Sequence, residues 1–225
     1  MSFDRSQDGR PQDGRIRNSY HHGNLRQTLI ETALRMIAER GPAGFSFAEL
    51  ARAAGVSPAA PYRHFSDRNA LLGEVARRGY EQFTETLQRA WNSGRPDPLR
   101  AFEACGRAYL QFARAEPAAY AVMFESSLST EADPALRLAS ERAFGVLRNA
   151  ADAVCAATLG PNRPPALMVA LHVWAMAHGI ASLFVGHGEQ ARRRLPMSPE
   201  ELLEAGVLVY LQSLGVSHNP SSGSA

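Results

Sequence analysis

The segment from Ser57 to Phe65 combines small side chains with hydrogen-bond donors, and reads Ser-Pro-Ala-Ala-Pro-Tyr-Arg-His-Phe. Ala59 and Ala60 are small enough for close approach to another molecule, and an alanine can pack on a thymine methyl group. The next three side chains, Tyr62, Arg63 and His64, can all donate hydrogen bonds. The major groove of DNA, about 12 Å wide, accepts a short element with this mixture of side chains. Phe65 is predicted to face the core.

Two preceding helices are predicted to position this segment. Leu25, Leu29, Ala33 and Ile37 share one face of a helix over 24–40, which Gly41-Pro42 ends. Ser46 and Glu49 have the spacing of a capping box at the start of a short second helix.

The turn and the third helix follow directly. Gly55 is predicted to turn the chain with a positive φ. A third helix then begins with Ser57 as cap and Pro58 at its first position. Pro61 removes a helical hydrogen bond there. Ser66 or Asp67 caps a long fourth helix that reaches about Asn92. Short helices around a glycine turn over 46–65 predict a helix-turn-helix.

The carboxy-terminal half carries a second candidate site. Trp174 and His178 lie four residues apart, on one face of a helix. They can line a ligand pocket, or they can serve packing or a subunit interface. Aromatic and methionine side chains would suit an apolar or aromatic ligand. The candidate pocket residues are Phe112, Met123, Phe124, Phe144, Trp174 and His178.

The chain is predicted to be all-α, with about nine helices. After a break at 93–96, helices are expected over 98–115, 117–126, 133–159, 165–187 and 199–214. Ser198, Pro199 and Glu201 give the last helix a capping signal, and Gly215 ends it. The stretch 166–186 is apolar and free of acidic and basic residues, which fits either a membrane span or a helix buried in a core or subunit interface. The buried helix is favoured, because no second such stretch exists.

Composition narrows the class of protein. The 225 residues carry a net charge of +2, and 45% of them are hydrophobic, as in a globular protein. Two cysteines without a Cys/His cluster argue against a disulfide scaffold and a structural zinc site. No cofactor and no metal are expected. The sequence contains no GxSxG, HExxH, P-loop or GxGxxG motif, so no catalytic motif predicts an enzyme. We expect a cytoplasmic protein with no secretory signal and with disordered arms at 1–19 and 216–225.

Residues at many positions, in matching order and spacing, resemble those of the TetR family of transcriptional regulators. They include Phe45-Ser46-Phe47, Ala54-Gly55-Val56-Ser57, Tyr62-Arg63-His64-Phe65 and Arg68-Asn69-Ala70-Leu71-Leu72. The lead-in Tyr20–Arg26 resembles one subset of this family, and Trp174…His178-Gly179 resembles a TetR carboxy-terminal domain type. Arg68 stands where the family usually has lysine, Asn69 stands where it often has glutamate, and Pro61 departs from the commonest pattern.

The resemblance implies a DNA-binding domain over 20–82 and a ligand-binding and dimerisation domain over 93–215. Tyr62 and Arg68 would bind backbone phosphates. The implied mechanism is a homodimer, joined through helices 165–187 and 199–214, that represses until a small molecule releases it from operator DNA. A regulator without a small-molecule ligand and, less favoured, a helical enzyme remain alternatives. The residues expected at the DNA are Ser46, Phe47, Ser57, Pro58, Ala59, Ala60, Tyr62, Arg63, His64 and Arg68.

Overall fold

The computed structural model describes residues 25–126, 128–129, 133–158, 164–185 and 196–215. These residues form eight α-helices and two short 3-10 helices, with no strand among them. The all-α prediction is confirmed, and the number of helices is close to the nine expected. Both predicted arms and the lead-in 20–24 lie outside the described residues.

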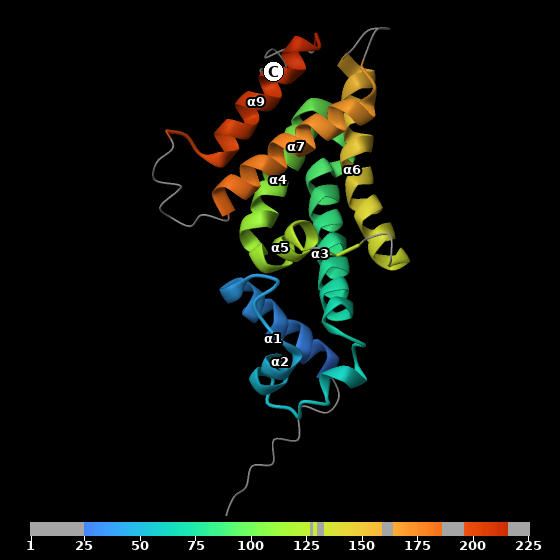
Figure 1. The fold of residues 1–225 in the computed structure, drawn as a ribbon. Helices are drawn as coiled ribbons and strands as arrows, with labels where there is room; N and C mark the ends of the chain where they lie inside the picture. Colours follow the sequence, from blue (N-terminus) through green and yellow to red (C-terminus); the bar gives the residue numbers. More distant parts are fainter. Residues whose placement is uncertain (1–24, 127, 130–132, 159–163, 186–195, 216–225) are drawn as a thin grey trace, which may run out of the picture.

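The amino-terminal unit contains α1 (Leu25–Arg40) and α2 (Phe47–Ala53) (Figure 1). The predicted capping box is present: Ser46 accepts a hydrogen bond from the Glu49 backbone, and the Glu49 carboxylate accepts one from the Ser46 backbone. Gly55 has φ of 70°, the left-handed conformation that the turn requires. Local signals therefore fix this unit up to Val56.

The next element differs from the prediction. In place of an α-helix capped by Ser57, the chain forms a turn over 58–60 and a 3-10 helix, η1 (Pro61–Arg63), whose cap residue is Ala60. Pro61 has no N–H, so it cannot donate the α-helical bond to the Ser57 carbonyl. That carbonyl accepts instead from the Ala60 N–H, three residues on, at 2.9 Å. The proline thus shortens and tightens the element.

Helix α3 (Arg68–Trp91) connects the amino-terminal unit with the rest of the molecule (Figure 1). Asp67 caps it by accepting the Ala70 N–H at 2.8 Å, and Asn92 ends it in the left-handed conformation. Its inward face is buried as predicted, from Leu72 and Val75 to Phe83 and Leu87. A single straight element therefore spans both parts.

The remaining helices pack around α3 in two groups, one in contact with α3 and one beyond α4. A short 3-10 helix, η2 (Asn92–Gly94), leads to α4 (Pro98–Ala115) and α5 (Pro117–Glu125), followed by α6 (Pro134–Thr158), α7 (Ala166–Val185) and α9 (Pro199–Ser213). Helices α4, α5 and α6 contact α3, and α7 and α9 lie against each other and against α4. The Ser198–Glu201 capping box and a positive φ at Gly215 delimit α9 as predicted.

Candidate nucleic-acid interface and helical-domain cavity

The predicted hydrogen-bond donors of the 57–65 segment are exposed. Arg63 and His64 are exposed, and 61% of Tyr62 is accessible. Ala59 is also exposed, whereas Ala60 is buried. Ser57 and Pro58 lie on the exposed turn that precedes them. The turn and the 3-10 helix therefore present a surface of small and polar groups, with Ala59 rather than Ala60 as the accessible alanine.

Phe47 and Ser46 have local structural partners. Phe47 is only 6% exposed, and its ring meets the Tyr62 ring edge-on at 5.0 Å between centroids. Edge-to-face packing of this kind stabilises the orientation of both rings. The Ser46 hydroxyl exchanges hydrogen bonds with Glu49 in the capping box. Phe47 thus supports Tyr62 from inside, and the second helix supports the exposed segment.

Arg68 lies at the start of α3 with an incompletely satisfied guanidinium group. The group sits 5.0 Å from the centroid of the Phe45 ring, a cation–π contact. Its Nε and Nη2 atoms are buried and have no hydrogen-bond partner among the described residues. Unpaired buried donors on a cation are costly, so this group would gain from an anionic acceptor.

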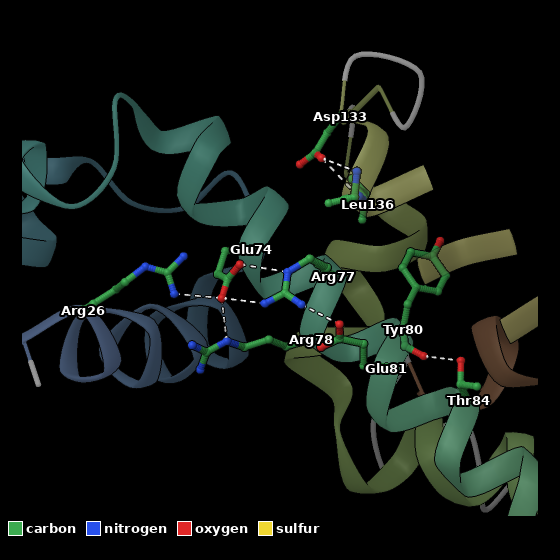
Figure 2. A network of polar contacts seen from close by, with 10 residues as sticks. Arg26, Glu74, Arg77, Arg78, Tyr80, Glu81, Thr84, Asp133 and Leu136 are labelled. Carbon is green, nitrogen blue, oxygen red and sulfur yellow. Dashed lines mark hydrogen bonds and ion pairs between the residues drawn. The ribbon is translucent and has the colours of Figure 1, made fainter. Parts of the chain in front are cut away.

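An ion-pair network centred on Glu74 joins α1 to α3 (Figure 2). The carboxylate, 10% exposed, accepts hydrogen bonds from Arg26 at 2.9 Å, from Arg77 at 3.0 Å and from Arg78 at 2.8 Å. Partial burial would raise the pKa of Glu74, but the three guanidinium groups outweigh it and lower the pKa to about 2. Arg26 also lies 5.1 Å over the ring of Phe65. The network therefore ties α1, the end of the 57–65 segment and α3 together.

A cavity of about 400 Å³ lies between the helices of the carboxy-terminal part. Three of the predicted pocket residues line it: Phe124, Phe144 and Trp174. The sequence prediction missed lining residues that α3 and α4 contribute. Their regular helical spacing gave no signal that distinguished them from core residues. These additional residues include Tyr80, Phe83, Leu87, Cys105 and Tyr109.

The other three predicted residues pack behind the cavity wall. Phe112 is buried against Phe83, with ring centroids 4.9 Å apart. Met123 faces α3 at Gly79, where a Cβ atom would lie 2.6 Å from its sulfur. The carbonyl of Met123 accepts the Tyr80 hydroxyl at 3.0 Å. Phe112 and Met123 thus hold α4 and α5 against α3 instead of contacting the cavity.

His178 is not among the residues that line the cavity, and its ring is engaged by two tyrosines. Its Nδ1 lies 2.8 Å from the Tyr120 hydroxyl and 3.1 Å from the Tyr109 hydroxyl, and the two hydroxyls are 3.3 Å apart. Burial lowers the pKa of His178 and raises the pKa of Tyr109 and Tyr120. All three groups are therefore neutral near pH 7, and they join α4, α5 and α7.

Helices α7 and α9 carry apolar side chains that are exposed among the described residues. Leu183 is 62% exposed and Val209 is 66% exposed. Among the described helices, α7 is long and apolar enough to cross a membrane, over Ala166–Phe184, of which 39% is buried. A core or interface helix has the same length and composition. Further exposed apolar residues on these helices are Leu167, Met168, Leu171 and Leu208.

Two family models match the chain. The model for bacterial regulatory proteins of the tetR family matches residues 29–75, which contain α2, η1, Arg68 and Glu74. The model for a tetracyclin repressor-like carboxy-terminal domain matches residues 102–210, which contain the cavity residues of α4, α5, α6 and α7 but not those of α3. The chain belongs to the TetR family of transcriptional regulators. The predicted family is thereby confirmed.

Individual proteins are similar to part or most of the chain. The HTH-type transcriptional regulator AcrR of Shigella flexneri is 40% identical over 50 residues, a match that spans 22% of this chain and 23% of that protein. A Rhodococcus protein of unknown function is 31% identical in a solved structure, with a TM-score of 0.73 and coverage of 88% of this chain and 99% of that one. AibR, solved with isovaleryl coenzyme A and operator DNA, has the same fold at 21% identity, a TM-score of 0.64 and coverage of 82% and 96%.

Proposed function

We propose that this TetR-family chain is a cytoplasmic homodimeric repressor, released from its operator by a small molecule that occupies the cavity. One observation carries the proposal. Helix α3 begins with Arg68 beside the exposed 57–65 segment, and the same helix supplies Tyr80, Phe83 and Leu87 to the cavity wall. The proposed DNA-binding domain, 20–82, and ligand-binding domain, 93–215, are therefore joined by this helix.

At the DNA, phosphate contacts provide affinity and base contacts provide sequence choice. Tyr62, His64 and Arg68 bind phosphates in this proposal, and Arg63 reaches the groove from η1. The position of Arg68 as the first residue of α3, directly after the exposed 57–65 segment, supports its role, because a guanidinium group is a strong phosphate ligand. The other residues expected at the DNA shape or border this surface: Ser46, Phe47, Ser57, Pro58, Ala59 and Ala60.

The dimer forms through α7 and α9. Their exposed leucine, methionine and valine side chains make an apolar face, and a four-helix seam with the same face of a second copy would bury it. A two-fold axis through this seam places two 57–65 segments on one side of the dimer. Recognition elements roughly 34–36 Å apart then meet successive major grooves.

A ligand acts by favouring one of two dimer arrangements. If it binds more tightly to the arrangement in which the recognition elements no longer match the groove spacing, the population leaves the operator. The likeness to AibR, which binds isovaleryl coenzyme A and operator DNA, supports this mechanism over a regulator without a ligand. An enzymatic role is not proposed, because the sequence carries no GxSxG, HExxH, P-loop or GxGxxG motif.

The test is selection of bound duplexes from a random DNA pool by the purified chain at a fixed salt concentration. We expect enrichment of an inverted repeat whose half-sites lie about one helical turn apart. Small apolar compounds are then screened for their ability to release the chain from that DNA sequence. Binding to all DNA without enrichment would overturn the operator-binding proposal, and an operator complex that no compound releases would favour the regulator without a ligand.

A further inference from the structure

The aromatic content of the cavity wall sets the first requirement on a ligand. Five helices contribute six rings, so a bound molecule would be surrounded by π faces and edges. The rings of Phe83 and Tyr109 lie 5.0 Å apart, and those of Phe144 and Trp174 lie 5.7 Å apart. Ring faces carry negative potential and attract cations, and cages of such rings bind quaternary ammonium groups. The six rings belong to Tyr80, Phe83, Tyr109, Phe124, Phe144 and Trp174.

The polar atoms of the wall set the second requirement. The Tyr80 hydroxyl donates to the Met123 carbonyl, and the Tyr109 hydroxyl is engaged with Tyr120 and His178. The Ser140 hydroxyl donates to the Arg137 carbonyl. Burial raises the pKa of the Cys105 thiol to about 12, which keeps it neutral. None of these groups is a free donor for an anionic ligand.

The indole N–H of Trp174 interacts with the Tyr109 hydroxyl. Glu141 carries the only formal charge among the described lining residues. No arginine, lysine or histidine is found among them. Its carboxylate lies 3.9 Å from Nε of Arg137, and both side chains are more than half exposed. Charged hydrogen bonds normally measure about 2.7–2.9 Å, so this ion pair is loose. The carboxylate at the rim can therefore accept a second cation.

From these observations we infer that the cavity selects an organic cation, an amine or quaternary ammonium group attached to an apolar aromatic body. The body fills the aromatic interior, and the ammonium group lies against the rings of Phe144 and Trp174 near Glu141. Carboxylates and phosphates are disfavoured, because the described wall offers them no cation. The inference rests on the proposed ligand-binding role of the cavity and names the class of ligand.

The test compares three naphthalene compounds of similar size on the full chain. They are (1-naphthylmethyl)trimethylammonium, its uncharged carbon isostere 1-neopentylnaphthalene, and 1-naphthaleneacetate. Calorimetry measures the two soluble ions, and displacement of the cation measures the neutral compound. We expect the cation to bind roughly tenfold more tightly than the neutral isostere, and the anion to bind most weakly.

Two variants of α6 separate local from general charge effects. Glu141→Gln should reduce the preference for the cation to about twofold, because it removes the carboxylate and keeps the shape. Asp152→Asn removes the same charge from an exposed position about 16 Å along the helix and should leave the preference unchanged. Equal effects of the two variants would overturn the role of Glu141.

The outcomes also separate this inference from the proposed function. If the neutral compound or the anion binds as tightly as the cation, the cavity binds ligands but the inferred charge class is wrong. If none of the three compounds binds, both the inferred class and the ligand-binding role of the cavity are overturned. Circular dichroism of each variant verifies that its helices are intact.

Discussion

The Glu74 network provides a measurable test of how the amino-terminal unit is held to α3. A carboxyl pKa lowered from 4.5 to about 2 corresponds to an upper limit of about 3 kcal/mol of stabilisation at pH 7, since a tenfold change in proton affinity is worth about 1.4 kcal/mol. The arginine partners are between 28% and 44% exposed, and solvent screening reduces the contribution to about 1–2 kcal/mol. We expect Glu74→Gln to lower the free energy of unfolding by that amount.

The pH dependence follows from the direction of the pKa shift. A carboxyl group whose pKa is lower in the folded state stabilises the fold fully above the unfolded pKa of 4.5, and this stabilisation is lost as the pH falls towards 2. The difference between wild type and Glu74→Gln should therefore be largest near pH 7 and shrink to less than half at pH 3. Urea unfolding at both pH values and at one fixed protein concentration measures it.

Glu81→Gln is the matched control for this experiment. Glu81 lies on the same helix, is 51% exposed and pairs with Arg77 alone among the arginines of the network. We expect it to cost less than about 0.5 kcal/mol, as exposed helical pairs do. If Glu74→Gln is as stable as wild type at pH 7, or if its effect does not change with pH, the three-arginine network is not the source of the stabilisation.

Three further predictions concern the proposed DNA and dimer surfaces. Arg68→Ala should weaken binding to operator and random DNA alike and reduce the slope of log K against log salt by about 1 in titrations, and a changed base preference at constant affinity would contradict the phosphate contact. Arg63→Ala should relax selection at particular base pairs at a cost of about 1–3 kcal/mol, and an unchanged selected sequence would remove Arg63 from the base-reading residues. Val209→Asp should raise the dimer dissociation constant roughly a hundredfold in sedimentation equilibrium, by burying an unpaired charge. Leu138 is another exposed apolar residue, on α6, and Leu138→Asp should leave the dimer dissociation constant unchanged.

Sequence signals predicted the helix boundaries well where the cause is local. The capping boxes at Ser46 and Ser198 and the positive φ at Gly55 depend only on neighbouring residues, and all three are present. The prediction of a third α-helix was wrong for an equally local reason. Pro58 at a first helical position is favourable, but Pro61 three residues later removes the bond that an α-helix would need. The hydrogen bond lost at Pro61 therefore outweighed the favourable position of Pro58.

The cavity was only partly predictable, because its wall depends on how five helices face one another. Tyr109 and Phe112 lie three residues apart on α4, and both are buried aromatic residues. Only Tyr109 lines the cavity, whereas Phe112 packs against Phe83. Helical periodicity places both on the inward face and cannot distinguish a wall residue from a packing residue, since the difference depends on the rotation of α4 relative to α3.

Helix α3 joins the two proposed sites by a chain of contacts. Glu74 and Tyr80 are six residues apart, about 9 Å along the helix. Glu74 is fixed to α1 by Arg26, and Tyr80 is fixed to α5 through the Met123 carbonyl. Gly79, between them, is packed so closely on Met123 that even a Cβ atom would collide. We expect a ligand that displaces the ring of Tyr80 to break its hydrogen bond to the Met123 carbonyl and to shift α5 relative to α3. The Glu74 network would carry a movement of α3 to α1 and to Phe65, at the end of the 57–65 segment.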